Sequence, residues 1–302
     1  MIWQTARFRI DLGEPRVMGI VNLTPDSFSD GDPSGTPASA LATCERLLRE
    51  GADLLDLGAE SSRPGAEPIG AELELARLLP VLREAVRFGC PVSVDTVKAE
   101  VMRRALALGA DVVNDVSALR GTDALAAVAS HPSCGVCLMH MRGTSATMHA
   151  ETQYDDVVGE VVSFLRERVV VLEREGVRRD RIVVDPGIGF AKTAAQNMEL
   201  LARQKELLGI GVPLLIGWSR KSTLARLSGV AATASAERTP RQRALLDAAS
   251  VAAALLAVER GARIVRVHDV AGTVAALAVW KAAAGRPIIR AEPIDREPSP
   301  RA

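Results

Sequence analysis

Short apolar segments recur along this chain, and a stretch with helical periodicity follows most of them. The segments are rich in Val, Ile and Leu, and most are continuous rather than alternating, which is typical of parallel strands buried on both faces. They span residues 16–23, 53–59, 90–95, 111–116, 135–140, 182–188, 213–218 and 263–268. The pattern therefore predicts eight buried strands.

Amphipathic segments lie between these strands, for example over residues 40–51, 72–89, 99–109 and 157–176. Glycines that suit a helix C-terminus turning into the next strand are Gly51, Gly89, Gly109, Gly176 and Gly261. Eight strand–helix units in 302 residues predict an α/β fold, a single-domain (β/α)₈ barrel. An open doubly wound sheet is the alternative, but the glycine-rich fingerprint favoured after its first strand is missing from the sequence.

We expect the barrel to occupy residues 1–287, with residues 1–15 as an N-terminal lead-in. Residues 288–302 carry proline and charge without periodicity, and they are expected to form a loosely held C-terminal tail.

The composition allows a large core and excludes several classes of partner. Apolar residues make up 48% of the chain, and 37 basic residues balance 37 acidic ones, which disfavours nucleic acid or a membrane surface as partner. The N-terminus lacks the apolar centre of a signal peptide. Cys134 and Cys137 have the spacing of a redox or zinc pair, but no second pair follows, so we interpret the four cysteines as core thiols. A cytoplasmic protein is expected.

Side chains that can bind or react stand where each predicted strand ends, which is where a (β/α)₈ barrel places its chemistry. In chain order these groups are Asn22, Glu60 to Arg63, Asp95, Thr96, Asn114, Asp115, Met139, His140, Asp185, Ser219 to Ser222, Arg266 and His268. Single members have simpler explanations, since Asp115 or Thr96 can cap a helix and His140 can be a satisfied buried imidazole. Eight strands that end alike nevertheless favour one convergent site.

Three of these groups suit a flat heterocycle. Asp95, Asn114 and Asp185 come from different strands and are rich in hydrogen-bond acceptors, as an edge with several N–H donors requires. A pteridine or guanine ring with an amino group has such an edge. An ion-pair network in the barrel floor is the alternative, and it is disfavoured because no cationic residue neighbours Asp95 or Asp185 in the sequence.

A second group is cationic and suits phosphate or diphosphate oxygens. It comprises Lys221, Arg266 and His268 from strand ends and Arg63 from a loop. A diphosphate usually binds with Mg²⁺, which prefers oxygen and takes few protein ligands. The side-chain oxygen of Asn22 is the predicted metal ligand.

Two loops are expected to cover this site. The segment from Thr24 to Gly31 follows the first strand and contains Phe28, which predicts an aromatic cover that excludes water. The segment from Ser61 to Gly65 follows the second strand and contains Pro64, which predicts a more rigid second cover.

The motifs MGIVNLTPDSFSDG, LGAESSRPGA, SVDT, VVNDVS, CLMHM, DPGIGFAK, GWSRKS and RVHDV occur in this order. Together they resemble the bacterial dihydropteroate synthase family of pterin-binding barrels over roughly residues 10–285. The resemblance implies a transferase of folate biosynthesis, the target of sulfonamides, that joins 4-aminobenzoate to (7,8-dihydropterin-6-yl)methyl diphosphate. Diphosphate leaves first, the arylamine then attacks, and 7,8-dihydropteroate is formed. The family is typically a homodimer through its last helices. Residues 271–285 are apolar enough to serve as that interface or, equally, to pack on the barrel.

The resemblance also implies residue roles. The residues implied to act in catalysis are Lys221, Arg63, Asp30 and Asp95. Those implied to bind the pterin are Asp95, Asn114, Met139, Asp185, Phe190, Gly217 and Lys221. The residues implied to bind diphosphate are Asn22, Arg63, Arg266 and His268, with Asn22 also binding Mg²⁺. Those implied to line the aminobenzoate pocket are Phe28, Ser62, Arg63, Pro64, Phe190, Lys221 and Ser222.

The sequence departs from the family pattern at Ser62, where threonine is usual, at Trp218, and at Ala249-Ser250, where a Gly-Ser or Gly-Thr pair is usual. None of these departures removes a residue with an assigned role. Two other functions stay open: a pterin-barrel methyltransferase acting on a corrinoid protein, which needs neither the first loop nor the cationic group, and a pterin-binding paralogue without turnover.

Overall fold

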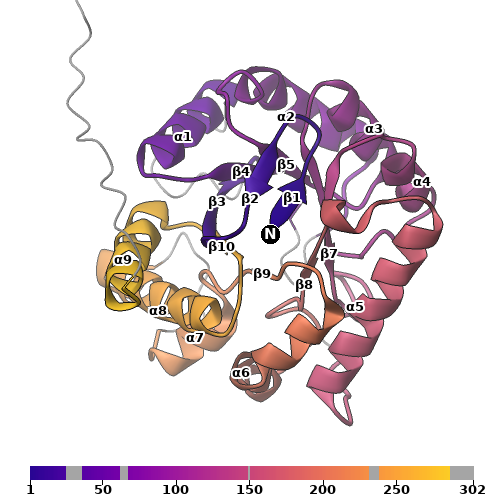
Figure 1. Ribbon diagram of the computed structural model, residues 1–302. Coiled ribbons are helices and arrows are strands. Elements are labelled where there is room, and N and C mark those ends of the chain that lie inside the picture. Colours follow the sequence, from indigo (N-terminus) through magenta and orange to yellow (C-terminus); the bar gives the residue numbers. More distant parts are fainter. Residues whose placement is uncertain (25–35, 62–66, 149, 231–237, 286–302) are drawn as a thin grey trace, which may run out of the picture.

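The computed structural model describes residues 1–24, 36–61, 67–148, 150–230 and 238–285. Within this part of the chain, eight parallel strands form a barrel and helices surround it (Figure 1). The strands are β3 (Arg16–Asn22), β4 (Leu54–Gly58), β5 (Val92–Asp95), β6 (Val112–Asp115), β7 (Gly135–Met139), β8 (Ile182–Asp185), β9 (Leu215–Ile216) and β10 (Ile264–Val267). Their order is β8-β7-β6-β5-β4-β3-β10-β9, and a bridge between Val184 and Leu214 joins β8 to β9. The predicted (β/α)₈ barrel is confirmed.

The outer layer consists of helices that follow the strands in turn. They are α1 (Pro37–Arg49), α2 (Ala71–Ala85), α3 (Ala99–Ala107), α4 (Ala124–Ala129), α5 (Val157–Arg174), α6 (Ala194–Ala202), α7 (Ser222–Leu227), α8 (Pro240–Glu259) and α9 (Val270–Ala283), with 3₁₀ turns η2 (Arg179–Arg181) and η3 (Gln204–Ile210). The predicted helix-ending glycines all have positive φ, from +73° at Gly89 to +104° at Gly109. Glycine adopts this conformation without the steric cost that a side chain imposes, so each helix can turn directly into the next connection.

The barrel interior is filled by side chains at its N-terminal end. They form one buried cluster of Trp3, Ile10, Leu12, Met18, Leu54, Val112, Cys137, Val183, Leu215 and Ile264. Most come from strands, as expected for strands whose two faces are both buried. This end of the barrel is therefore closed by apolar packing, which leaves the opposite end for polar groups.

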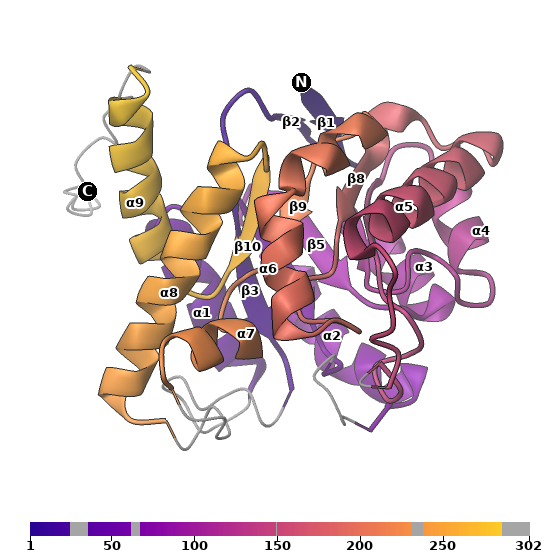
Figure 2. The same cartoon turned by 90° about the horizontal axis from the view of Figure 1, so that it is seen from below.

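The N-terminal segment is more than the expected lead-in, because it contains a hairpin of β1 (Ile2–Gln4) and β2 (Arg9–Asp11). The hairpin lies across one mouth of the barrel (Figures 1 and 2). Its Trp3 is fully buried, and the indole Nε1 donates to the carbonyl oxygen of Arg181 over 2.9 Å. Three-residue strands give too little periodicity to be predicted from sequence.

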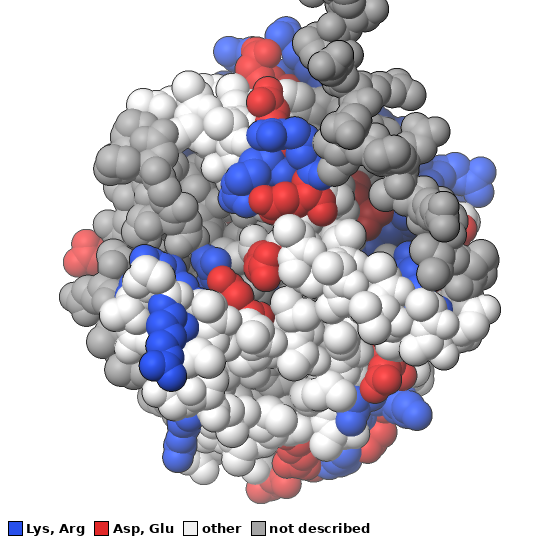
Figure 3. All heavy atoms as spheres, turned by 90° about the vertical axis from the view of Figure 1, so that its left-hand side faces the viewer, with Lys and Arg blue, Asp and Glu red and all other residues white. Residues whose placement is uncertain are grey.

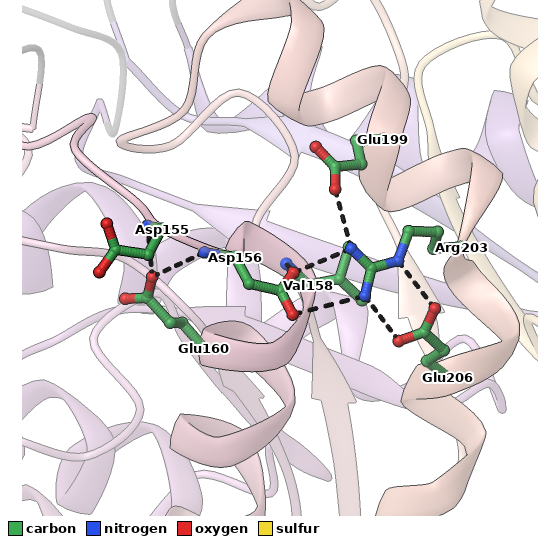
Figure 4. Close-up of polar contacts among 7 residues, drawn as sticks. All are labelled: Asp155, Asp156, Val158, Glu160, Glu199, Arg203 and Glu206. Atoms are coloured by element: carbon green, nitrogen blue, oxygen red, sulfur yellow. Dashed lines mark hydrogen bonds and ion pairs between the residues drawn. The ribbon is translucent and has the colours of Figure 1, made fainter.

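A network of ion pairs links the beginning of α5 to the end of α6 (Figure 4). The Arg203 guanidinium at the end of α6 pairs with Asp156, which caps α5, and with Glu199 and Glu206 at 2.8–2.9 Å. These side chains are partly exposed, so solvent screening limits their contribution to stability.

In the part of the chain that the structure describes, no helix is both long and apolar enough to cross a membrane. Cys44, Cys134 and Cys137 are buried and Cys90 is half-buried, and all four are free thiols. Burial raises the pKa of Cys44 to about 12, which makes an inert core thiol. The predicted C-terminal tail lies outside the described residues.

Candidate active site

The C-terminal ends of the strands form a bowl that gathers most of the predicted site residues. One cavity at its base is lined by Asp95, Asn114, Val116, Met139, Asp185, Ile188, Phe190, Gly217, Lys221 and Arg266. Asp185 and Arg266 thus face the same space, although β8 and β10 are separated by β9. Because parallel strands of a closed barrel end at one rim, residues distant in sequence converge there. Of the predicted site residues, the structure brings Asp95, Asn114, Met139, Asp185, Phe190, Gly217, Lys221 and Arg266 together around one cavity.

The acidic side of the bowl consists of strand-end residues whose side chains are held in place by burial and hydrogen bonds. Asp185 ends β8, is 7% exposed, and accepts the Gly187 N–H at its Oδ1 over 2.7 Å. Burial raises the pKa of Asp185, and that backbone hydrogen bond opposes the rise. Asn114 is 5% exposed on β6. Gly217 lies opposite, where an added Cβ would stand 3.9 Å from Asp185 Oδ2, so the missing side chain leaves room beside this carboxylate.

A cationic partner does lie beside Asp95, contrary to the expectation from sequence. Arg266 donates from Nε to Asp56 Oδ2 over 2.6 Å and from a terminal nitrogen to Asp95 Oδ2 over 2.9 Å. Asn114 Nδ2 donates to the same Asp56 oxygen over 3.2 Å. The expectation failed because Arg266 comes from β10, which the barrel brings close to β4 and β5 only after folding. The acidic and cationic groups therefore form one network.

Asp56 is the functional-site residue that the sequence reading missed. It lies within β4, two positions before the strand ends, and its side chain is fully buried. A lone carboxylate in the apolar run LLDLG was the available signal, because a buried carboxylate needs a partner. Here that partner is the predicted diphosphate-binding residue.

Lys221 stands at the N-terminus of α7 and faces the bowl. Its Nζ lies 4.1 Å from the centroid of the Phe190 ring, a cation–π contact. Burial, followed by the charge of Arg266, lowers the pKa of Lys221 to about 8. The turn before it is held from α8, since the Arg220 N–H donates to Ser250 Oγ over 2.9 Å and Arg220 Nε donates to Asp247 over 2.7 Å. The departure from the family pattern at Ala249-Ser250 thus retains the hydroxyl that holds this turn.

The other cationic and polar groups lie higher on the rim. The backbone N–H of His268 donates to Ser219 Oγ over 3.1 Å, and His268 Nδ1 lies 2.9 Å from the same oxygen. Asn22 is the half-buried last residue of β3, which pairs with β10. Ser222 is exposed as the first residue of α7. The predicted site residues Phe28, Asp30, Ser62, Arg63 and Pro64 lie outside the described residues.

Several other strand-end groups are structural. The Asp115 carboxylate accepts the backbone N–H groups of Ser117 and Leu119 over 2.6 and 2.9 Å, so it holds the following turn. Glu60 pairs with Lys98 over 2.7 Å and accepts the Ile69 N–H. For these groups, the simpler explanation of capping and local support holds.

The bowl is narrow in this form, and a larger cavity adjoins it. The space between the bowl side chains is about 30 Å³, far below the size of usual ligand pockets. The second cavity, of about 430 Å³, shares Asp95 and Val116 with the bowl and is also lined by Arg120, Met141 and Thr144. Arg266 and Lys221 both line the narrow bowl.

The fold and the site define a class of pterin-binding barrel, and comparison with known proteins agrees. Residues 18–268 match the family model described as pterin binding enzyme. A dihydropteroate synthase of Neisseria meningitidis serogroup B is 48% identical over 286 residues, which cover 93% of this chain and 97% of that protein. The chain belongs to the dihydropteroate synthase family.

Solved structures of this family superpose closely. The Xanthomonas albilineans dihydropteroate synthase with 4-aminobenzoic acid has a TM-score of 0.85 at 48% identity, covering 95% of this chain and 100% of that one. The Burkholderia cenocepacia dihydropteroate synthase complexed with 7,8-dihydropteroate has a TM-score of 0.82 at 43% identity, covering 94% and 96%. These matches favour the synthase over the methyltransferase and the inactive paralogue.

We predict a bell-shaped pH dependence of kcat/KM for dihydropteroate synthesis. Burial raises the pKa of Asp95 to about 7, while Lys221 has its pKa lowered to about 8. Below pH 7 Asp95 gains a proton and loses acceptor capacity, and above pH 8 Lys221 loses its charge, so the maximum falls between these values. Steady-state kinetics across this range measure both limbs. In Lys221→Arg the alkaline limb moves upward, because guanidinium stays charged; an unmoved limb contradicts the assignment.

Proposed function

We propose that the bowl carries out the reaction of the dihydropteroate synthase family, in which 4-aminobenzoate and (7,8-dihydropterin-6-yl)methyl diphosphate give 7,8-dihydropteroate and diphosphate. The observation that carries this proposal is the shared cavity, which brings two carboxylates and an amide together with Lys221 and Arg266. Acceptors on one side suit the N–H edge of the ring, and cations on the other suit its departing anion.

In this proposal the pterin lies in the base of the bowl. The Asp185 oxygen not held by Gly187 accepts from the amino-pyrimidine edge, and Asp95 and Asn114 accept from the other ring nitrogens. Met139 and Phe190, which are 4% and 8% exposed, supply apolar contacts to the ring faces, and Gly217 leaves space for it. Lys221 donates to an acceptor on the ring.

Diphosphate is assigned to the rim, where Asn22, Arg266 and His268 approach from the neighbouring strands β3 and β10. The donor set fits a Mg²⁺ ion that arrives with its substrate. Among the described residues no cluster of three His, Cys, Asp or Glu side chains is arranged for a metal, and Mg²⁺ commonly keeps water and phosphate ligands with one or two protein oxygens. Bound there, the ion neutralises diphosphate charge, and Asn22 is its proposed protein ligand.

The chemistry is a substitution at the methylene carbon of the pterin. The C–O bond breaks with its electron pair going to diphosphate, and Arg266 and His268 stabilise the negative charge that develops. The cation left behind is delocalised over the pterin and stabilised by Asp95 and, on the family pattern, Asp30. The arylamine nitrogen then forms the C–N bond and loses its proton.

The aminobenzoate pocket is proposed around Lys221, Phe190 and Ser222. The remaining residues assigned to it are carried over from the family motifs by sequence position, and they are Phe28, Ser62, Arg63 and Pro64. A site that excludes water at this stage prevents hydrolysis of the pterin cation.

We further propose that the protein is a homodimer through α8 and α9. The outward residues of these helices are mainly apolar, including Leu245, Ala252 and Leu256 on α8 and Ala275 and Val279 on α9. Val279 is 71% exposed. The face of the molecule that holds α9 shows few charged side chains in its lower half (Figure 3). Contiguous exposed apolar surface of this kind marks protein–protein interfaces.

Lys221→Ala is expected to lower kcat by about 100- to 1000-fold, the usual loss when one preorganised charged donor is removed. A coupled assay for diphosphate release, run with and without 4-aminobenzoate, measures it, and circular dichroism checks that the fold is intact. Lys205→Ala, which alters an exposed lysine outside the bowl, is the control and should retain full activity. Normal turnover by the Lys221 variant would exclude the proposed role, and a wild-type chain that releases no diphosphate would exclude the function.

Chelation of Mg²⁺ is expected to weaken binding of the pterin diphosphate at least tenfold, while pterin alone binds with unchanged affinity. The reason is that an ion held by Asn22 would neutralise diphosphate charge, which pterin alone lacks. Isothermal titration calorimetry with both ligands, before and after chelator, makes the comparison. If chelation lowers the affinity for both ligands equally, or for neither, the proposal that the metal binds at the diphosphate site is wrong.

Val279→Glu is expected to convert the dimer to monomer, because each introduced carboxylate would be buried at an apolar interface without a partner. Size-exclusion chromatography with light scattering gives the mass. Leu73→Glu is the matched control, since Leu73 is a 47% exposed apolar residue on α2 outside the proposed interface. A monomeric wild-type protein at micromolar concentration would refute the dimer proposal.

A further inference from the structure

Lys192 is a buried lysine that does not line the bowl. Its side chain belongs to the loop after β8 and is 8% exposed. The ammonium nitrogen lies 3.1 Å from the Gly187 carbonyl oxygen, 3.0 Å from the Phe190 carbonyl oxygen and 3.0 Å from His140 Nδ1. Within the described residues it makes no ion pair. Its amino group is therefore surrounded by neutral hydrogen-bond acceptors, and burial lowers the pKa of Lys192 to about 7.

These acceptors come from the ends of two neighbouring strands. His140 directly follows β7, whereas Gly187 and Phe190 follow β8. Burial and the charge of Lys192 lower the pKa of His140 to about 2, so the imidazole is neutral and its Nδ1 can accept. The loop and strand end are in direct contact, since an added Cβ at Gly187 would lie 2.0 Å from the His140 carbonyl oxygen. Lys192 thus ties two strand ends together at a point where the backbones already touch.

The loop that Lys192 holds carries one proposed pterin contact, Phe190, and is bonded to a second, Asp185. The Gly187 N–H fixes Asp185 Oδ1 over 2.7 Å, and the Phe190 ring contacts the Lys221 ammonium. Gly189 packs on the Lys221 side chain, because an added Cβ there would lie 3.1 Å from its Cδ. Displacing the loop would therefore disturb a carboxylate, an aromatic ring and a lysine at once.

The same loop is also tied to α7, which begins at the bowl. Asn197 is 1% exposed, its Oδ1 accepts the Gly189 N–H over 2.8 Å, and its Nδ2 donates to Thr223 Oγ1 over 3.1 Å. The loop is thus fixed on one side by Lys192 and on the other by Asn197. Of these two residues, only Lys192 is titratable.

We propose that Lys192 is a positioning residue for pterin binding, acting through the Gly187 and Phe190 carbonyl groups and through His140. This proposal rests on the proposed function of the bowl. A residue without N–H donors removes the donor that the Phe190 carbonyl oxygen and His140 Nδ1 share, and it leaves the Gly187 carbonyl oxygen with the Phe190 N–H alone. Burying polar atoms without a donor is costly. The loop then shifts to satisfy them, and Asp185 and Phe190 move with it.

Arg181 provides a matched control at the other end of the barrel. Its buried guanidinium also donates to main-chain carbonyl groups, those of Cys134 over 2.7 Å and Val128 over 3.2 Å. It lies beside the N-terminal hairpin, since its own carbonyl accepts from Trp3. Lys192→Met and Arg181→Met therefore remove comparable interactions, one at the bowl and one far from it.

The test is the affinity for 6-hydroxymethyl-7,8-dihydropterin, measured by calorimetry well below each variant's melting temperature. Lys192→Met should weaken binding at least tenfold, and Arg181→Met should lower the melting temperature with pterin affinity unchanged within twofold. Lys192→Arg should recover part of the affinity, because guanidinium supplies N–H donors in a different geometry. If Lys192→Met does not fold, Lys192→Gln takes its place in the comparison with Arg181→Met. Glutamine keeps a shorter, neutral N–H donor, and this variant should bind the pterin more weakly than the wild-type protein does.

Wild-type pterin affinity in the folded Lys192 variant, or an equal loss in Arg181→Met, would overturn the positioning role. Failure of the wild-type protein to bind the pterin would instead overturn the proposed function, so the two failures are distinguishable.

Discussion

The bowl depends on the arrangement of one guanidinium between two carboxylates. Arg266, Asp56 and Asp95 come from three strands, and the Asp56 side chain has no solvent exposure. Charges buried this far from water are tolerated only when they are paired and hydrogen-bonded. Breaking the cluster by removing one partner would leave an uncompensated buried charge, which is more costly than the pair itself. The network therefore fixes where the acidic and cationic sides of the site can lie.

The two ends of the barrel use buried cations for different purposes. At the N-terminal end, Arg181 and Trp3 close the barrel with hydrogen bonds to main-chain carbonyl groups and apolar packing. At the C-terminal end, Arg266 and Lys221 are placed beside carboxylates and an aromatic ring, where a ligand can replace their contacts. This matches the division in (β/α)₈ barrels between stability at one end and chemistry at the other. Lys192 combines the two, because its contacts are those of a structural cation but lie beside the bowl.

The barrel and its ring of strand-end groups could be predicted from sequence because both follow from local patterns. Continuous apolar runs give the buried strands, and parallel closure brings every strand end to one rim. Contacts between those ends do not follow from local patterns. Arg266 lies 210 residues from Asp56 along the chain, and no periodicity in the sequence indicates that these two residues form an ion pair. The β1–β2 hairpin was missed since its strands are only three residues long, and Lys192 was missed since its partners are backbone carbonyl groups, which have no sequence signature.

The cluster also explains how a charged bowl can accept a flat ring at modest cost. The space between the side chains is only about 30 Å³, and the protein's own donors hold Asp95 Oδ2 and Asp56 Oδ2. In the proposed complex, ring N–H groups take the place of the Arg266 N–H groups on Asp95, so the acceptor is never left unpaired. Arg266 keeps its second contact to Asp56 and turns its freed donors toward the diphosphate. In that proposal, the charged cluster that fixes the shape of the bowl also supplies the groups that bind the ring and the anion.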